Sequence, residues 1–404
     1  MEVAPDGRIS FSRARHLPTR FGVRPADRPT THEEAEEQMH IRAAKTIALT
    51  VALATTLIAM VAAGPAAAGG GVRAVKVAGG LNGPSAFTFT AKGTIVYLER
   101  GTGEVRFRNP KTDFDRLFFR IPGVNGEGER GALGVALHPR WPEKPFVYVY
   151  VTRRADGRLR NQIVRIRDRG GEGKGYTKIL TTPASSSPYH NGGRILFGPD
   201  GKLYVIVGDG HDASNAQDLT GNLRGKILRM NPDGSIPGTN PTIDGRRTRI
   251  FAFGIRNSFG FTFDPEQGNL WETENGPECN DEINFVQRGD NYAWGPRQAC
   301  PDTNRDGPAP RRLPEVTISD TIGITGAAFC DGCGLAGRDG DLLFGANNDG
   351  VLRRVSLDAA RDDVVGGPIT MLDAPGGTIH SLEVGPNGAI YFSDYGSIYR
   401  IRGA

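Results

Sequence analysis

The chain has 404 residues, a formal net charge of +4, 56 glycines and 27 prolines, so it is rich in turns and close to electrical neutrality. This length suits one large all-β domain or about two to three smaller domains. No dense block of lysine and arginine occurs in the sequence, which argues against a nucleic-acid-binding surface.

The N-terminal part of the chain carries signals of export. Residues 1–38 are polar and show no period, and we expect an unstructured extension or a start-site artefact there. A basic start at Met39 precedes an apolar run at 46–63, and Ala66–Ala68 then resembles a cleavage site. Residues 39–68 therefore predict a signal peptide and a secreted or extracytoplasmic protein. If the apolar run stays uncut, it is long enough to anchor the chain in a membrane.

Between residues 75 and 404 one unit recurs, consisting of an apolar strand, a Pro/Asp/Gly turn and a second apolar strand. Proline sets φ and glycine accepts positive φ, so each turn closes a hairpin. The clearest copies are ILFGPDGKLYVIVGDG, FTFDPEQGNLWETENG and LEVGPNGAIYFSDYG, at 195–210, 261–276 and 382–396, and weaker copies lie at 87–103, 135–152 and 337–350. Six copies indicate radial repetition, so residues 75–404 predict an all-β, six-bladed β-propeller.

The four cysteines fit an exported protein. Proximity in sequence favours the pairs Cys279–Cys300 and Cys330–Cys333, although sequence alone does not fix the pairing. A four-thiolate zinc site is the alternative, but only Cys330 and Cys333 have the close spacing that such a site needs.

Two groups of polar residues in loops are candidates for chemistry. His190 precedes two glycines and is either a working residue or the cap of a turn. Arg256 lies in an apolar stretch, where a charge needs a partner. A later loop is rich in oxygen atoms, which suits calcium, or else it is a solvated acidic loop; it contains Glu274, Asn275, Gly276, Pro277, Asp281 and Glu282.

A series of motifs in this order resembles the soluble quinoprotein sugar dehydrogenases, the glucose/sorbosone dehydrogenase family. The motifs are ERGALGVALHPRW at 129–141, YHNGGRILFGPDGKLYVIVGDG at 189–210, GIRNSFG at 254–260, ENGPECNDEINFV at 274–286 and GDNYAWG at 289–295. The resemblance implies a six-bladed propeller that oxidises an aldose hydroxyl to a lactone. By this resemblance, hydride would pass to pyrroloquinoline quinone with the help of calcium, and an external acceptor would then take the electrons.

The resemblance also implies roles for particular residues. His190 would be the general base, for which an imidazole is well suited, and Arg256 would stabilise charge on the reduced quinone. The quinone would be contacted by Glu129, Arg256, Asn257 and Asn275. The carbonyl groups of Gly276 and Pro277 would bind the calcium that polarises the quinone, and a second calcium would involve Asp281, Glu282 and Tyr292.

The chain departs from the family pattern around the quinone. Glu129, Phe259 and Asn275 replace glutamines, the stretch 346–349 lacks the family's lysine, and Thr378 and His380 stand in place of arginines. Each lost charge-assisted hydrogen bond removes about 1.5–3 kcal/mol. The alternative function is therefore a propeller without cofactor that binds carbohydrate or a protein partner, and a calcium-dependent hydrolase is a third class.

Overall fold

The computed structural model describes residues 71–404, which form six four-stranded antiparallel sheets. The predicted signal peptide at 39–68 and the extension at 1–38 lie outside the described residues. Within the described range, no helix is both long and apolar enough to cross a membrane.

Each sheet is one blade of a propeller, with its strands ordered from the propeller axis outward. Blade 1 contains β2 (Pro84–Phe89), β3 (Ile95–Glu99), β4 (Glu104–Arg108) and β5 (Asp115–Arg120). Blade 2 contains β6 (Ala132–Leu137), β7 (Phe146–Ala155), β8 (Arg158–Arg169) and β9 (Glu172–Pro183). Blade 3 contains β10 (Ile195–Phe197), β11 (Leu203–Val207), β12 (Lys226–Met230) and β15 (Ile250–Phe253).

The second half of the ring repeats this order. Blade 4 contains β16 (Ser258–Phe263), β17 (Leu270–Glu274), β18 (Asp281–Val286) and β19 (Val316–Ile318). Blade 5 contains β20 (Ile324–Phe329), β21 (Leu342–Ala346), β22 (Val351–Leu357) and β23 (Val364–Asp373). Blade 6 contains β24 (Ser381–Val384), β25 (Ile390–Ser393), β26 (Ser397–Gly403) and β1 (Val72–Gly79). Outside the blades lie α2 (Ser214–Gln217) and the small pair β13 (Thr242–Ile243) and β14 (Arg246–Arg247).

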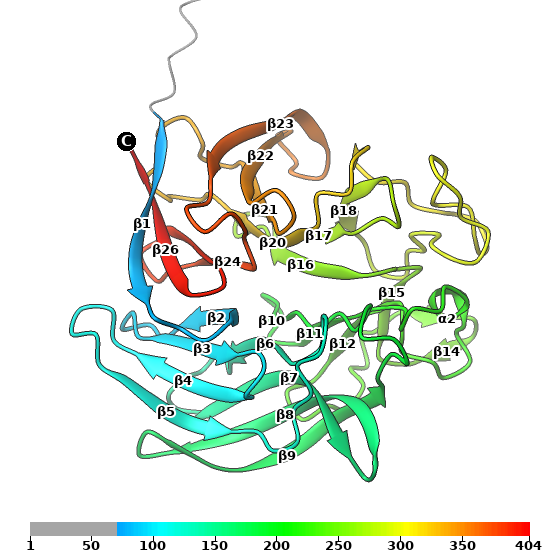
Figure 1. Cartoon of the computed structure of the whole chain (residues 1–404). Helices are drawn as coiled ribbons and strands as arrows, with labels where there is room; N and C mark the ends of the chain where they lie inside the picture. Colours follow the sequence, from blue (N-terminus) through cyan, green and yellow to red (C-terminus); the bar gives the residue numbers. More distant parts are fainter. Residues whose placement is uncertain (1–70) are drawn as a thin grey trace, which may run out of the picture. The chain divides into compact units, whose positions relative to one another are not determined.

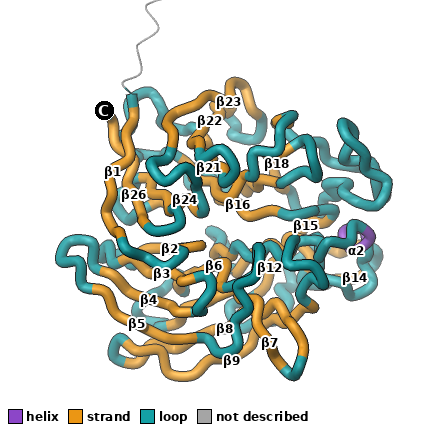
Figure 2. Tube along the Cα trace, viewed as in Figure 1, coloured by secondary structure: helices purple, strands orange, loops and turns teal. Residues whose placement is uncertain are grey.

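The innermost strands follow one another around a central axis. β2 contacts β6, β6 contacts β10, β16 contacts β20, β20 contacts β24, and β24 returns to β2. β1, the first described strand, pairs with β26, the last, so one blade is built from both ends of the described chain (Figure 1). Strands and loops make up nearly all of the ring (Figure 2). The predicted six-bladed β-propeller is confirmed.

The hydrophobic core lies between successive blades as six separate clusters. Strand β7 begins with the uninterrupted apolar and aromatic run FVYVYV because both of its faces are buried. Side chains alternate between the two faces of a strand. Val147, Val149 and Val151 accordingly pack toward blade 1, whereas Tyr148 and Tyr150 pack toward blade 3. Both predicted disulfides, Cys279–Cys300 and Cys330–Cys333, are present.

Candidate functional site

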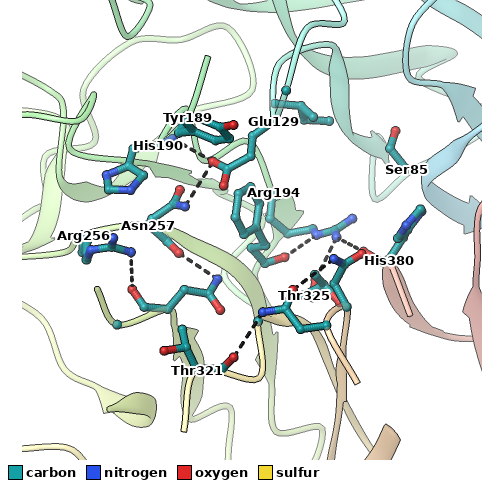
Figure 3. Close-up of a pocket in the computed structure, with 18 of the residues that line it drawn as sticks. Ser85, Glu129, Tyr189, His190, Arg194, Arg256, Asn257, Thr321, Thr325 and His380 are labelled. Carbon is teal, nitrogen blue, oxygen red and sulfur yellow. Dashed lines mark hydrogen bonds between the residues drawn. The ribbon is translucent and has the colours of Figure 1, made fainter. Parts of the chain in front are cut away.

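A cavity of about 460 Å³ opens on the propeller axis, at the end where the innermost strands begin. Loops from several blades form its wall, so residues far apart in sequence meet there (Figure 3). Of the residues predicted from sequence, the cavity is lined by Glu129, His190, Arg256, Asn257, Asn275, Gly276 and Pro277. The cavity volume falls in the range of pockets that bind small molecules.

His190 is held in an unusual backbone conformation at the edge of this cavity. Its φ is 58°, in the left-handed region that residues other than glycine rarely occupy. The backbone N–H of His190 donates to Glu129 Oε2 at 2.7 Å, and the next residue, Asn191, is buried and hydrogen-bonded on both sides. Strain of this kind persists only where surrounding contacts enforce it, and it gathers at functional sites.

A buried carboxylate orients the ring of His190. Nδ1 of His190 lies 2.7 Å from Oδ1 of Asp209, a residue just beyond the end of strand β11 that is 1% exposed. The other carboxylate oxygen accepts a hydrogen bond from Nε1 of Trp294 at 2.8 Å. Because an ionised carboxylate only accepts hydrogen bonds, Nδ1 carries the proton and Nε2 keeps its lone pair. In this arrangement Nε2 of His190 can accept a proton, as the predicted role of general base requires.

Sequence reasoning missed Asp209 and Trp294 as members of the site. Asp209 lies 19 residues beyond His190, and Trp294 lies 85 residues beyond Asp209. The signal that could have found Asp209 was an acid placed just after the wholly apolar strand β11, where an unpaired charge is costly. The glycines after His190 let two segments of the chain approach each other closely. A Cβ at Gly192 would meet the backbone of Ile206 and Gly208, so the residue permits contact with the protein itself.

Arg256 and Asn257 occupy the wall beside His190. Nη1 of Arg256 donates to the carbonyl of Asn275 at 2.8 Å, and its guanidinium lies 5.3 Å from the ring centre of Trp294. Nδ2 of Asn257 donates to Oε2 of Glu129 at 3.1 Å. Glu129 therefore joins the loop that carries Asn257 to the loop that carries His190.

The buried carboxylate of Glu274 holds the backbone of Arg256 and Asn257. Its Oε1 accepts the backbone N–H groups of Arg256 at 3.1 Å and of Asn257 at 2.6 Å. Burial, reinforced by the neighbouring Glu272, raises the pKa of Glu274 well above its usual value. Burial lowers the pKa of Arg256, against the opposing charge of Glu274. The loop that carries Arg256 and Asn257 is thus held to the end of β17 by a buried acid.

Gly276 and Pro277 form the next part of the wall. A Cβ at position 276 would collide with the carbonyl oxygen of Cys279, so the tight loop requires glycine. Asp281 holds this loop in place, because its carboxylate accepts the N–H of Gly276 at 2.9 Å and of Gly323 at 2.7 Å. Asp281 therefore ties the cavity wall of blade 4 to that of blade 5.

The residues predicted for a second calcium ion have separate partners. Glu282 accepts from Nδ2 of Asn304 at 2.8 Å, and burial raises its pKa to about 7. The hydroxyl of Tyr292 donates to the carbonyl of Phe285 at 2.7 Å, in the core between blades 3 and 4. In residues 71–404, no group of three or more His, Cys, Asp or Glu is placed to hold a metal. The second calcium site remains a prediction.

Arg194 closes the floor of the cavity. Its guanidinium donates to the carbonyl groups of Phe259, Thr325 and His380 and to the hydroxyl of Ser381, at 2.9–3.0 Å. These contacts reach blades 4, 5 and 6 from blade 3 across the axis (Figure 3). Arg194 therefore links blade 3 to blades 4, 5 and 6.

On the side of blades 5 and 6 the lining is polar but neutral. Asn347, Asn348 and His380 stand there. Burial, followed by the charges of Arg100 and Arg194, lowers the pKa of His380 to about 4. An imidazole with this pKa is uncharged near pH 7, so this side offers hydrogen bonds without a positive charge.

Comparison of the sequence with known proteins identifies one family. The sequence profile of the glucose/sorbosone dehydrogenase family matches residues 81–400. The chain belongs to the glucose/sorbosone dehydrogenase family. Aldose sugar dehydrogenase YliI of Escherichia coli is 27% identical over 333 residues, which cover 77% of this chain and 86% of the relative. This relative is named as a dehydrogenase, that is, an oxidoreductase.

Two further family members extend the comparison. Quinoprotein glucose dehydrogenase B of Acinetobacter calcoaceticus is 32% identical over 244 residues, covering 53% of this chain and 50% of the relative. The match thus spans about half the length of that relative. The structure of the PQQ-bound form of aldose sugar dehydrogenase from Streptomyces coelicolor superposes with a TM-score of 0.71 and 26% identity, covering 82% of this chain and 98% of the other.

Proposed function

We propose that this chain is an exported, quinone-dependent oxidoreductase that converts an aldose to a lactone with the help of calcium. The observation that carries the proposal is the buried pair His190–Asp209 at the edge of the axial cavity, with Arg256 in the same wall. The family relation and the PQQ-bound relative support the cofactor. The two disulfides support export, since such bonds persist mainly in oxidising compartments.

The free polar atoms of the cavity wall fit a ligand such as pyrroloquinoline quinone. Within the part of the chain that the structure describes, Oδ1 of Asn257, Oδ1 of Asn275 and Nε of Arg256 have no hydrogen-bond partner. All three residues line the cavity. Buried polar atoms normally find partners, so these three favour a polar ligand that supplies them. The guanidinium of Arg256 also suits a ligand that carries carboxylates.

When bound, the quinone would supply the two-electron acceptor, and calcium would polarise it. Arg256, Asn257, Asn275 and Glu129 would hold the quinone. The carbonyl oxygens of Gly276 and Pro277 would hold the calcium ion, which prefers oxygen ligands.

His190 performs the proton transfer in this proposal. Nε2 of His190 takes the proton from the anomeric hydroxyl of the sugar, and Asp209 stabilises the imidazolium that forms. Trp294 fixes Asp209 through its second oxygen. Glu129 fixes the backbone at His190, so the base is held in place before substrate arrives.

Calorimetric titration of the calcium-loaded chain, from Gly69 onward, with pyrroloquinoline quinone tests the proposal. We expect stoichiometric binding, followed by oxidation of aldoses with a dye acceptor. His190→Ala should reduce kcat by about 10²- to 10⁴-fold while the quinone still binds. If no quinone binds at high micromolar concentration, the alternative of a binding propeller for carbohydrate or a protein partner takes precedence. Turnover that is unaffected by His190→Ala contradicts the proposed base.

A further inference from the structure

Beside His190, two aromatic side chains form a ledge that the proposed chemistry does not use. The ring of His211 stacks on the ring of His190, with centroids 4.7 Å apart and planes inclined by 23°. Tyr189 meets His211 edge to face, at a centroid distance of 6.3 Å. Both residues line the cavity. We call Tyr189 and His211 the aromatic ledge.

The backbone holds this ledge in a fixed position. His211 has a φ of 63°, so both stacked histidines adopt the left-handed conformation that residues other than glycine rarely occupy. The N–H of His211 donates to Oδ1 of Asp209 at 2.7 Å, the same atom that meets His190. The N–H of Gly210 donates to the carbonyl of His190 at 3.1 Å. Asp209 therefore positions the base and the ledge together.

The ledge leads from solvent to the base. His190 is only 8% exposed, whereas Tyr189 is 48% exposed and His211 is also exposed. Tyr189 is directly adjacent to His190 in sequence and lies next to it at the cavity edge (Figure 3). The two rings therefore lie between solvent and His190 on this side of the cavity, within reach of a substrate that places one hydroxyl at His190.

We propose that the aromatic ledge is the platform that holds the sugar ring while His190 takes its proton, an inference that rests on the proposed function. A pyranose carries C–H groups on the faces of its ring, and the negatively charged face of an aromatic ring attracts such groups. The ring nitrogens of His211 can hydrogen-bond to a neighbouring hydroxyl. The geometry therefore selects closed pyranose rings over open-chain polyols, which present no continuous apolar face.

The chain offers a matched comparison for Tyr189. Tyr395 is 60% exposed and also stands at the cavity rim, but on a loop of blade 6. Its ring packs edge to face against His380 at 4.2 Å and not beside His190. A general effect of losing an exposed rim tyrosine would appear equally at both positions, whereas the platform requires an effect at position 189.

Steady-state kinetics on the quinone-loaded protein give the first test. Tyr189→Ala should raise KM for glucose by about three- to tenfold with little change in kcat, as expected for the loss of one aromatic contact. Tyr189→Phe, which keeps the ring, should restore the wild-type KM, and Tyr395→Ala should leave KM unchanged. Equal effects of Tyr189→Ala and Tyr395→Ala overturn the platform.

Saturation-transfer NMR on the protein without quinone gives a second readout, independent of turnover. We expect transfer to the C–H protons of glucose in the wild-type chain, weaker transfer to sorbitol, and a weaker glucose signal in Tyr189→Ala. If glucose shows these signals but no quinone binds, the proposed function fails and the platform stands. If wild type and Tyr189→Ala give the same signal, or neither gives one, the platform is wrong even where the enzyme turns over.

Discussion

Two sides of the cavity differ in the charge of the side chains that line them. The base wall, made of His190, Asp209, Arg256 and Asn257, combines a buried carboxylate, a strained backbone and a guanidinium. The neutral wall opposite it consists of Asn347, Asn348 and His380. There Thr378 Oγ1 donates to Asn347 at 2.7 Å, and Nδ2 of Asn348 donates to the carbonyl of Thr321 at 3.1 Å.

This difference separates two tasks. The proposed proton transfer needs a base that is oriented before the substrate arrives, and the contacts of the base wall would provide that orientation. Tight binding of an anionic ligand needs cations, and the neutral wall provides none. Arg100, also in the cavity lining, directs Nη1 to the backbone carbonyls of Gly126, Gly128 and Arg130. The two walls can therefore be tested separately.

Of the four substitutions that test this comparison, Asp209→Asn should have the largest effect, because it removes the carboxylate that contacts His190. An amide at this position can donate to Nδ1 of His190 and thereby favour the wrong tautomer, so kcat should fall by about 10²- to 10³-fold. Stopped-flow reduction of the quinone by sugar measures the step directly. Asp212→Asn, an exposed neighbour, is the control and should retain the wild-type rate. A similar rate in both variants would show that Asp209 does not orient the base.

Arg256→Met tests the cation of the base wall. It removes a charge-assisted contact worth about 1.5–3 kcal/mol, so the Kd for pyrroloquinoline quinone should rise by about 10- to 100-fold. Calorimetry measures this change without turnover. Arg246→Met, an exposed change in β14, serves as the control for loss of overall charge. If both variants bind the quinone equally well, Arg256 is not part of the quinone site.

Asn348→Lys should make the neutral wall bind an anionic quinone more tightly, because it supplies a positive charge there. We expect the affinity for the quinone to increase about tenfold, because one charge-assisted hydrogen bond is gained. Asn348→Met has a comparable length without the charge and should not improve binding. An unchanged affinity for Asn348→Lys would mean that the quinone does not reach this wall.

His380→Asn should change the pH dependence of stability. Burial lowers the pKa of His380 from 6.5 to about 4, so as pH falls the unfolded chain takes up its proton first. The folded state therefore loses stability between pH 6.5 and pH 4, by about 3 kcal/mol at most. Urea unfolding at about pH 7 and about pH 4.5 should show a smaller loss in His380→Asn than in the wild type. An equal loss would assign the acid sensitivity to other groups.

Most of the fold follows from local sequence patterns. The turns with Pro, Asp and Gly mark one hairpin in each blade, and the apolar strands between them are buried. The repeated unit does not reveal the innermost strand of blade 5, Ile324–Phe329, because its sequence, ITGAAF, is built largely from small residues. Outer strands such as Val364–Asp373 were not predicted from the sequence, because they are half exposed and their apolar residues follow no strong period. The pairing of β1 with β26 has no local signal at all.

The site was predictable only where a motif marked it. His190, Arg256 and Asn257 stand in short motifs with glycine, and each lines the cavity. Asp209 and Trp294 act on the base through contacts between loops of blades 3 and 4, which spacing in sequence does not reveal. The role of Asp281, which accepts two backbone N–H groups from different loops, likewise depends on contacts that only the folded chain makes.

The pairing of β1 with β26 has a consequence for the order of assembly. Blade 6 is incomplete until residues 397–403 have been synthesised and have paired with residues 72–79. The floor of the cavity depends on the same blade, because Arg194 reaches its Ser381 and the adjoining His380. A nascent chain therefore carries His190 and Arg256 long before it possesses a pocket. The cavity is complete only once the two ends of the ring have paired.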